Sequence, residues 1–334
     1  YGPDSWAHLT SGGTIANIES LWVARTVRYL PLVVRDMRAA LGLSPASWPA
    51  DVHTLLQIDP NEALESVARC FEDAAALLGA SPATTRKVIR AYLDSPHNVV
   101  ERGLPAVCEA LGSRPIVIVP ESHHYCFEKA LDALGMGRRS LVSVRVDDEF
   151  RMRMDDLEAK LDSAQQHGNH IVAVVAVVGS TEEGAVDPVD RILDLRASRR
   201  GQGKGSFWVH ADGAYGGYLR TMTVPERMGL GPAHAEVRVS GQVRTVPIVL
   251  PEPKICAALE RLGECDSIAI DPHKLGFIPY PAGAVCFKSN LVKPIVRQEA
   301  PYLDDAASDV NAERRSEGIG MYILEGSKPG AAAA

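Results

Sequence analysis

The chain has 334 residues, of which 46% are hydrophobic and 23% are charged. This composition is that of an ordinary globular protein, and it excludes a disordered chain, a collagen and a small disulfide-stabilised domain. With 35 Lys and Arg against 42 Asp and Glu, the net charge is −7. A mildly acidic chain lacks the basic surface of a general nucleic-acid-binding protein, so we expect no nucleic-acid partner.

The sequence also bears on compartment and metal binding. No stretch approaches the ~18 uncharged apolar residues that cross a bilayer, and no signal peptide is visible, so we expect a cytoplasmic protein without membrane contact. The six cysteines are scattered without the spacing of metal sites, so we expect reduced thiols and no metal. The chain starts at Tyr1 rather than at Met and closes on Ala331–Ala334; both ends look cut from a longer chain.

The first third of the chain is predicted to be mostly helical. The Gly-rich segment 8–14 is interpreted as a turn that leads into an amphipathic helix over 15–29. A connection punctuated by proline is expected over 31–60. Further helices are predicted over 61–78, 84–93 and 99–111.

From residue 114 onward, strands are predicted to alternate with helices. Short apolar runs typical of buried strands lie at 115–119, 141–146, 171–178, 207–211, 267–270 and 282–287. Helical patterns lie between them at 126–134, 154–166 and 188–198. This alternation predicts an α/β fold with a mostly parallel central sheet. The stretch 221–252, rich in Pro, Gly and Val, is interpreted as a surface insertion between two strands.

Reactive side chains follow four of the predicted strands. His124 comes after the first of these strands, and Ser180 and Thr181 come after a later one. Asp212 and Lys274 each follow another. Because ligands bind beyond the carboxyl ends of parallel strands, we expect these side chains to share one site.

Most of these residues also have a structural interpretation. Asp212 can close a turn before Gly213, His124 can lie exposed at a helix start, and a Gly pair can begin any helix. Lys274 has no equally simple structural explanation. Taken together, a lysine, a carboxylate and a Gly-rich helix start are what pyridoxal 5′-phosphate needs for a Schiff base, a pyridinium partner and a phosphate site.

Two segments carry a resemblance to a known family. Residues 271–280, DPHKLGFIPY, and residues 210–217, HADGAYGG, resemble the lysine and aspartate motifs of the group II pyridoxal-phosphate-dependent amino-acid decarboxylases. Further segments that resemble the bacterial tyrosine decarboxylase branch lie at 14–17, 124–130, 178–184 and 322–330. The resemblance implies the aspartate-aminotransferase-like fold, fold type I. It also implies that residues 1–334 are a cofactor-binding large domain without that family's N-terminal segment and small C-terminal domain.

The resemblance assigns a role to each matching residue. Lys274 would bond to the cofactor, Asp212 would pair with its ring nitrogen, and His124 and Ala214 would lie on the two faces of the ring. Tyr302 would take part in protonating the α-carbon of the substrate. The remaining residues implied in cofactor binding or substrate handling are Gly13, Thr14, Ser180, Thr181, His273 and Tyr280.

The activity implied by the resemblance is decarboxylation of an L-amino acid to its amine and carbon dioxide, by a homodimer. L-Tyrosine or a related aromatic amino acid is the expected substrate. Alternatives on the same fold are a glutamate decarboxylase and a carbon–carbon lyase like sphingosine-phosphate lyase. An alternative of another class is a catalytically silent scaffold or dimer partner.

Overall fold

The computed structural model describes residues 1–44, 48–223, 234–247, 251–298 and 319–326. Its centre is a seven-stranded sheet of order β1-β9-β8-β5-β4-β2-β3, and β6 and β7 form a separate sheet. The strands are β1 Trp6–Thr10, β2 Pro115–Pro120, β3 Leu141–Val144, β4 His170–Val177, β5 Trp208–Gly213, β6 His234–Val239, β7 Gln242–Pro247, β8 Ser267–Ile270 and β9 Gly283–Phe287. The α-helices are α1 Gly13–Ala40, α2 Val52–Leu55, α3 Pro60–Leu78, α4 Pro82–Asp94, α5 Val99–Arg102, α6 Leu104–Leu111, α7 Cys126–Ala133, α8 Met154–Gln166, α9 Val189–Gly201, α11 Pro253–Glu260 and α12 Val292–Val296.

In the large sheet, β9 runs against the other strands. β2 pairs in parallel with β3 and β4, β4 pairs with β5, and β5 pairs with β8. β9 pairs antiparallel with β8 on one side and with β1 on the other. The carboxyl ends of β2, β4, β5 and β8 therefore lie along one edge, and the predicted α/β fold with a mostly parallel sheet is confirmed.

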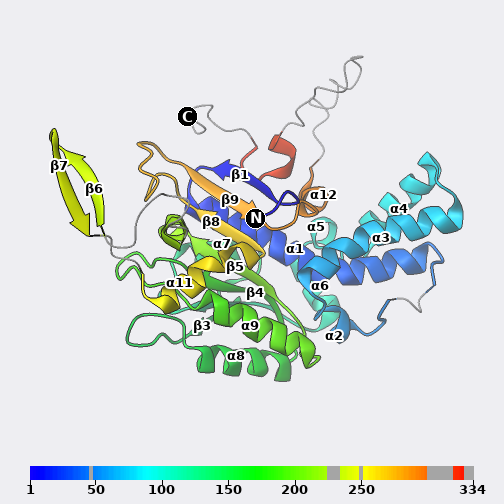
Figure 1. Ribbon diagram of the computed structural model, residues 1–334. Coiled ribbons are helices and arrows are strands. Elements are labelled where there is room, and N and C mark those ends of the chain that lie inside the picture. The colour runs from blue at the N-terminus through cyan, green and yellow to red at the C-terminus, as the bar shows by residue number, and fades with distance from the viewer. Residues whose placement is uncertain (45–47, 224–233, 248–250, 299–318, 327–334) are drawn as a thin grey trace, which may run out of the picture.

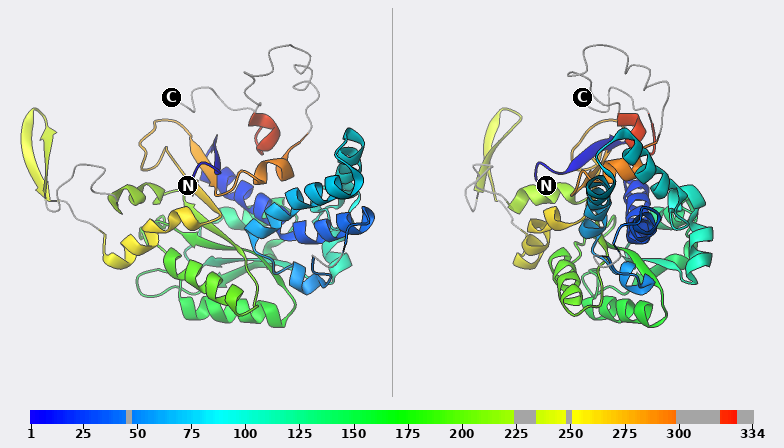
Figure 2. Two further views of the ribbon diagram at one scale, coloured as in Figure 1. Left: turned by 45° about the vertical axis from the view of Figure 1, so that its right-hand side comes forward. Right: turned by 90° about the vertical axis from the view of Figure 1, so that its right-hand side faces the viewer.

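Helices cover both faces of this sheet, as Figures 1 and 2 show. One face packs against α1, α3, α7 and α12, and the other packs against α8, α9 and α11. Alternate residues of β2 enter different layers, with Val117 and Val119 on the α1 side and Ile116 and Ile118 on the other. A strand that is buried on both faces has to be apolar throughout, which explains why the sequence reveals these strands.

Helix α1 extends beyond the position where the sequence predicts its end. It runs through Pro31 to Ala40, although proline removes a helical hydrogen bond and usually ends or kinks a helix. Val33, Val34 and Met37 are buried against α3 and α4, and the apolar area that they bury offsets this local cost. The predicted connection over 31–60 is therefore wrong up to Ala40.

Some other elements differ from prediction. The segment 8–14, predicted as a turn, holds the end of β1, and the predicted helix over 99–111 divides at Gly103, whose φ is 76°. The interpreted insertion 221–252 contains β6 and β7, an antiparallel hairpin that stands apart from the large sheet in Figure 1. Across the part of the chain that the structure describes, no helix is both long and apolar enough to cross a membrane.

Candidate active site

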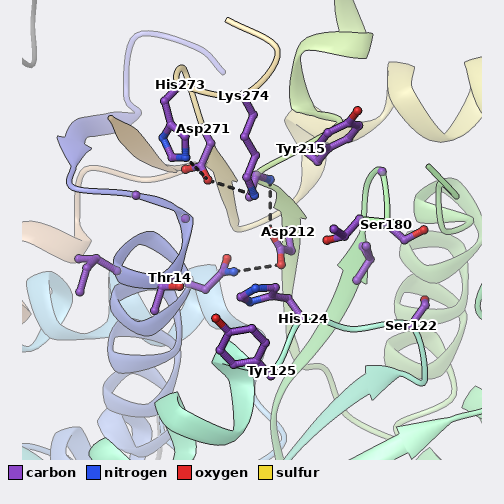
Figure 3. Close-up of a pocket in the computed structure, with 18 of the residues that line it drawn as sticks. Thr14, Ser122, His124, Tyr125, Ser180, Asp212, Tyr215, Asp271, His273 and Lys274 are labelled. Atoms are coloured by element: carbon purple, nitrogen blue, oxygen red, sulfur yellow. Dashed lines mark hydrogen bonds and ion pairs between the residues drawn. The ribbon is translucent and has the colours of Figure 1, made fainter. Parts of the chain in front are cut away.

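A cavity of about 330 Å³ opens at the carboxyl edge of the sheet. Its walls are the loops after β1, β2, β4, β5 and β8 together with the first turn of α1 (Figure 3). The structure thus gathers side chains that lie far apart in the sequence. The predicted site residues that line the cavity are Gly13, Thr14, His124, Ser180, Thr181, Asp212, Ala214, His273 and Lys274.

Lys274 lies in the turn that joins β8 to β9. Its backbone N–H donates to the carbonyl of Asp271 at 2.9 Å, which closes the turn. Its Nζ lies 3.3 Å from Oδ2 of Asp271, and about a third of the side chain is exposed. Figure 3 shows the side chain directed into the cavity, towards Asp212. The turn therefore presents a primary amine to any ligand in the cavity.

Asp212 supplies a buried carboxylate at the end of β5. Its Oδ1 accepts the backbone N–H of Ala214 at 3.2 Å, and its Oδ2 accepts the side-chain amide of Asn17 at 3.0 Å. Burial raises the pKa of Asp212, whereas these two hydrogen bonds and the nearby Lys274 lower it. A carboxylate held in this way can pair with a cationic nitrogen of a ligand.

His124 forms another wall of the cavity with a neutral ring. Its Nδ1 accepts the backbone N–H of Cys126 at 3.2 Å, so the proton of the neutral ring is on Nε2. Burial lowers the pKa of His124, Asp212 opposes this effect and Lys274 adds to it. The ring packs on Tyr125 with centroids 4.2 Å apart. The result is a flat, uncharged surface suited to an aromatic ligand.

The first turn of α1 is the side of the cavity suited to an anion. Because α1 begins at Gly13, the N–H groups of Gly13 and Thr14 have no carbonyl partner within the helix and favour negative charge. A Cβ atom at Gly13 would approach Cβ of Ala214 and Oδ2 of Asp271 to 2.8 Å each. Oδ1 of Asp271 is buried without a hydrogen-bond partner among the described residues. Glycine at this position therefore keeps a polar cradle open.

These features fit pyridoxal 5′-phosphate. The aldehyde of this group needs an amine, which Lys274 presents, and its pyridine nitrogen needs a carboxylate, which Asp212 presents. Its phosphate needs a helix N-terminus, where Gly13 and Thr14 lie. The open cradle at Gly13 leaves room for it, and the ring of His124 offers a stacking surface.

Other predicted residues are placed differently. The hydroxyl of Ser180 donates to Glu183 at 2.8 Å within its own loop, while Thr181 is exposed at the rim of the cavity. Tyr280 lies in the loop between Lys274 and β9 and is not among the residues that line the cavity. Tyr302 lies outside the described residues. The roles assigned to these four residues stay predictions.

Some cavity residues were not predicted as site residues. Asn17 lies one turn after Gly13 on the same face of α1, so the i, i+4 spacing would have indicated it. Asp271 opens the turn of the reactive lysine. Tyr125 and Tyr215 each directly follow a predicted site residue and line the same cavity.

Comparison with known proteins gives a consistent result. Residues 67–230 match the family described as the pyridoxal-dependent decarboxylase conserved domain. The chain is 32% identical to the L-tyrosine decarboxylase of Enterococcus faecium over 333 residues, which are 99% of this chain and 49% of that protein. It is 28% identical to the aspartate 1-decarboxylase of Aliivibrio fischeri over 216 residues, 65% of this chain and 31% of that protein. The crystal structure of mouse CSAD matches in fold, with a TM-score of 0.50 and 21% identity over 89% of this chain and 40% of that one.

The chain belongs to the pyridoxal-dependent decarboxylase family, whose cofactor is pyridoxal 5′-phosphate. Within this family it is similar to the bacterial L-tyrosine decarboxylases over nearly its whole length. The predicted family and cofactor are thereby confirmed. The chain spans about half the length of the curated relatives that it matches.

Proposed function

We propose that this chain carries the cofactor site of a decarboxylase that converts L-tyrosine into its amine and carbon dioxide. The observation that carries this proposal is the convergence of Lys274, Asp212 and His124 on one cavity beside the N-terminus of α1. The L-tyrosine decarboxylase of Enterococcus faecium, similar over 99% of this chain, supports the reaction and the substrate.

Each side chain has a separate task in this reaction. Pyridoxal phosphate, when bound, supplies an electron sink for the electron pair that remains when carbon dioxide departs. Lys274 would hold it through Nζ. Asp212, hydrogen-bonded to Asn17 and Ala214, would pair with its ring nitrogen and favour the protonated form of that nitrogen. His124, whose pKa is lowered by burial, would offer it an uncharged stacking surface.

The lining of the cavity favours an aromatic substrate over aspartate. Tyr125 and Tyr215 are 61% and 40% exposed and offer aromatic surface to a ligand. Aspartate carries a second carboxylate, for which arginine is the preferred partner. Among the described residues that line the cavity there is no arginine. Decarboxylation of aspartate is the second candidate, since the aspartate 1-decarboxylase of Aliivibrio fischeri is also similar.

The same proposal includes three features predicted from the sequence. Residues 1–334 form one cofactor-binding domain with an insertion over 221–252, two copies form a homodimer, and the protein is cytoplasmic. The resemblance to the decarboxylase family supports the first two, and the third stays a prediction from the sequence. The cofactor contacts of Gly13, Thr14, Ala214 and His273 belong to this proposal as well, supported by their place around the cavity.

The test is cofactor binding followed by substrate turnover. We expect the purified chain, mixed with pyridoxal phosphate, to show the visible absorbance band of a lysine-bonded cofactor. Lys274→Ala should lack this band, and the exposed control Lys87→Ala should keep it. The chain should release carbon dioxide from tyrosine but not from aspartate or glutamate. A chain that fails to bind pyridoxal phosphate even in excess would contradict the proposal. Release of carbon dioxide from aspartate alone would favour the second candidate.

A further inference from the structure

A row of five buried side chains leads from the middle of the sheet to the cavity. Trp208 Nε1 donates to Ser267 Oγ at 2.8 Å, and this oxygen lies 2.8 Å from His210 Nδ1. His210 Nε2 lies 2.9 Å from Asn17 Oδ1, and Asn17 Nδ2 lies 3.0 Å from Asp212 Oδ2. None of the five is more than 6% exposed, so these contacts do not compete with solvent.

The carboxylate end of the row fixes the direction of its hydrogen bonds. The carboxylate of Asp212 accepts, so Asn17 turns its amide N–H to Asp212 and its Oδ1 to His210 Nε2. Burial lowers the pKa of His210 to about 3, so the ring is neutral and its single proton is the one that meets Oδ1 of Asn17, on Nε2. Nδ1 is then an acceptor, and Ser267 Oγ, which accepts the indole N–H of Trp208, has its own hydrogen available for it.

This polarity leaves the amide of Asn17 only one orientation. Oδ1 faces the Nε2–H of His210, and Nδ2 faces Asp212. Nδ2 also lies 3.3 Å from Sγ of Cys126, a neutral thiol because burial raises its pKa to about 12. A flipped amide would place its oxygen against the carboxylate of Asp212, where two acceptors would repel one another. The ring of Phe127 packs edge-on against His210 and adds no charge.

We propose that this row, the Trp208–Asp212 relay, positions Asp212 to receive the ring nitrogen of the cofactor. The inference rests on the proposed function, because it concerns the carboxylate assigned to that nitrogen. Asn17 is the only relay member besides Asp212 among the described residues that line the cavity. Trp208, Ser267 and His210 act through Asn17 and are positioning residues. The relay keeps a donor on Oδ2, which lowers the pKa of Asp212 against the effect of burial and fixes the rotation of the carboxylate.

The first experiment compares Asn17→Ala with a matched control, Asn98→Ala. Asn98 is equally buried and makes two hydrogen bonds, to Tyr92 and Val100, far from the cavity in sequence. We expect Asn17→Ala to raise the Kd for pyridoxal phosphate by about tenfold, the usual effect of removing a hydrogen bond to a charged group. Loss of binding on acidification should also move to higher pH by roughly one unit, because the carboxylate then protonates more easily. Asn98→Ala should change neither.

A double-mutant cycle separates the relay from a general loss of packing. Ser267→Ala should weaken cofactor binding by about threefold in the wild-type background, and it should have no further effect in Asn17→Ala, because it acts through Asn17. Additive effects would overturn the relay, as would an Asn17→Ala variant that binds like Asn98→Ala. A wild-type chain that binds no cofactor would instead contradict the proposed function.

A third measurement needs no cofactor. Nitrogen-15 NMR of labelled histidine distinguishes the two neutral tautomers. We expect His210 to carry its proton on Nε2 in the wild-type chain and to lose this preference in Asn17→Ala. A proton on Nδ1 in the wild-type chain would reverse the direction of the relay and overturn the inference.

Discussion

Replacing Gly13 with alanine would fill the cradle at the start of α1. The new Cβ would lie 2.8 Å from Cβ of Ala214 and 2.8 Å from Oδ2 of Asp271, well inside normal contact distance. Both neighbours are buried and belong to the turns that end β5 and β8. The methyl group can therefore be accommodated only if one of these turns moves away from α1.

Two opposing effects set the size of the change. Overpacking a tight site costs about 1–3 kcal/mol, whereas alanine is up to about 1 kcal/mol more favourable than glycine within a helix. The net effect of Gly13→Ala on the free energy of unfolding is therefore a loss of about 0–3 kcal/mol. Cofactor binding should suffer more, because the methyl group and the displaced turns occupy the space beside the N–H groups that meet the phosphate. We expect the Kd for pyridoxal phosphate to rise at least about tenfold, which corresponds to ~1.4 kcal/mol.

Denaturant unfolding measures the first quantity, and titration of the cofactor absorbance measures the second. Gly201→Ala is the matched control, because a Cβ at this last residue of α9 meets nothing within 4 Å. The control should keep the wild-type Kd and be at least as stable as the wild type. A Gly13→Ala chain that binds the cofactor as tightly as Gly201→Ala would refute the assignment of this cradle to the phosphate.

Two predictions concern the stability of the fold. Burial lowers the pKa of His170 to about 3 from its ordinary 6.5. Below pH 6.5 the imidazole of His170 therefore binds a proton in the unfolded chain but not in the native chain. The free energy of unfolding should fall by up to about 1.4 kcal/mol per pH unit as the pH drops through this range. The free energy of unfolding of His170→Asn, measured with urea, should fall less steeply than that of the wild type as the pH drops below 6.5. An unchanged slope would show that His170 is not the origin of this pH dependence. Arg196→Leu should cost about 3–5 kcal/mol in urea unfolding, because it leaves Asp266 charged and buried. The exposed ion pair of Arg90 with Asp94 should contribute under about 1 kcal/mol to the free energy of unfolding. Equal losses of stability in Arg196→Leu and Arg90→Leu would show that burial does not determine the strength of these ion pairs.

The sequence predicts the middle of the sheet well for a physical reason. Strands β2 and β4 are buried on both faces, so they are continuous apolar runs that no exposed element resembles. The course of α1 beyond Pro31 was not predictable in this way, because it depends on packing against α3 and α4. The local sequence shows that a proline disfavours the helix at this position, but it does not show the tertiary contacts that offset this effect.

Some residues of the candidate site are also predictable from local sequence, and others depend on tertiary contacts. Lys274, Asp212 and His124 follow predicted strands directly, so the rule for parallel sheets is enough to place them together. The contacts of Asn17 with His210 and Asp212 join residues 193 and 195 positions apart. Nothing in the local sequence of α1 shows which strand its polar residue meets, and only the three-dimensional structure reveals the relay.

The pairing of β1 with β9 has a consequence for the order of folding. It sets Trp6 opposite Phe287, and so it closes nearly the whole described chain into one loop, a contact of very high sequence separation that forms slowly. The first turn of α1 directly follows β1, and the turn of Lys274 precedes β9, so both halves of the cofactor site meet only when this pair has formed. Pyridoxal phosphate should therefore bind only the completed sheet and stabilise it by mass action. We expect its uptake during refolding to follow the pairing of β1 with β9.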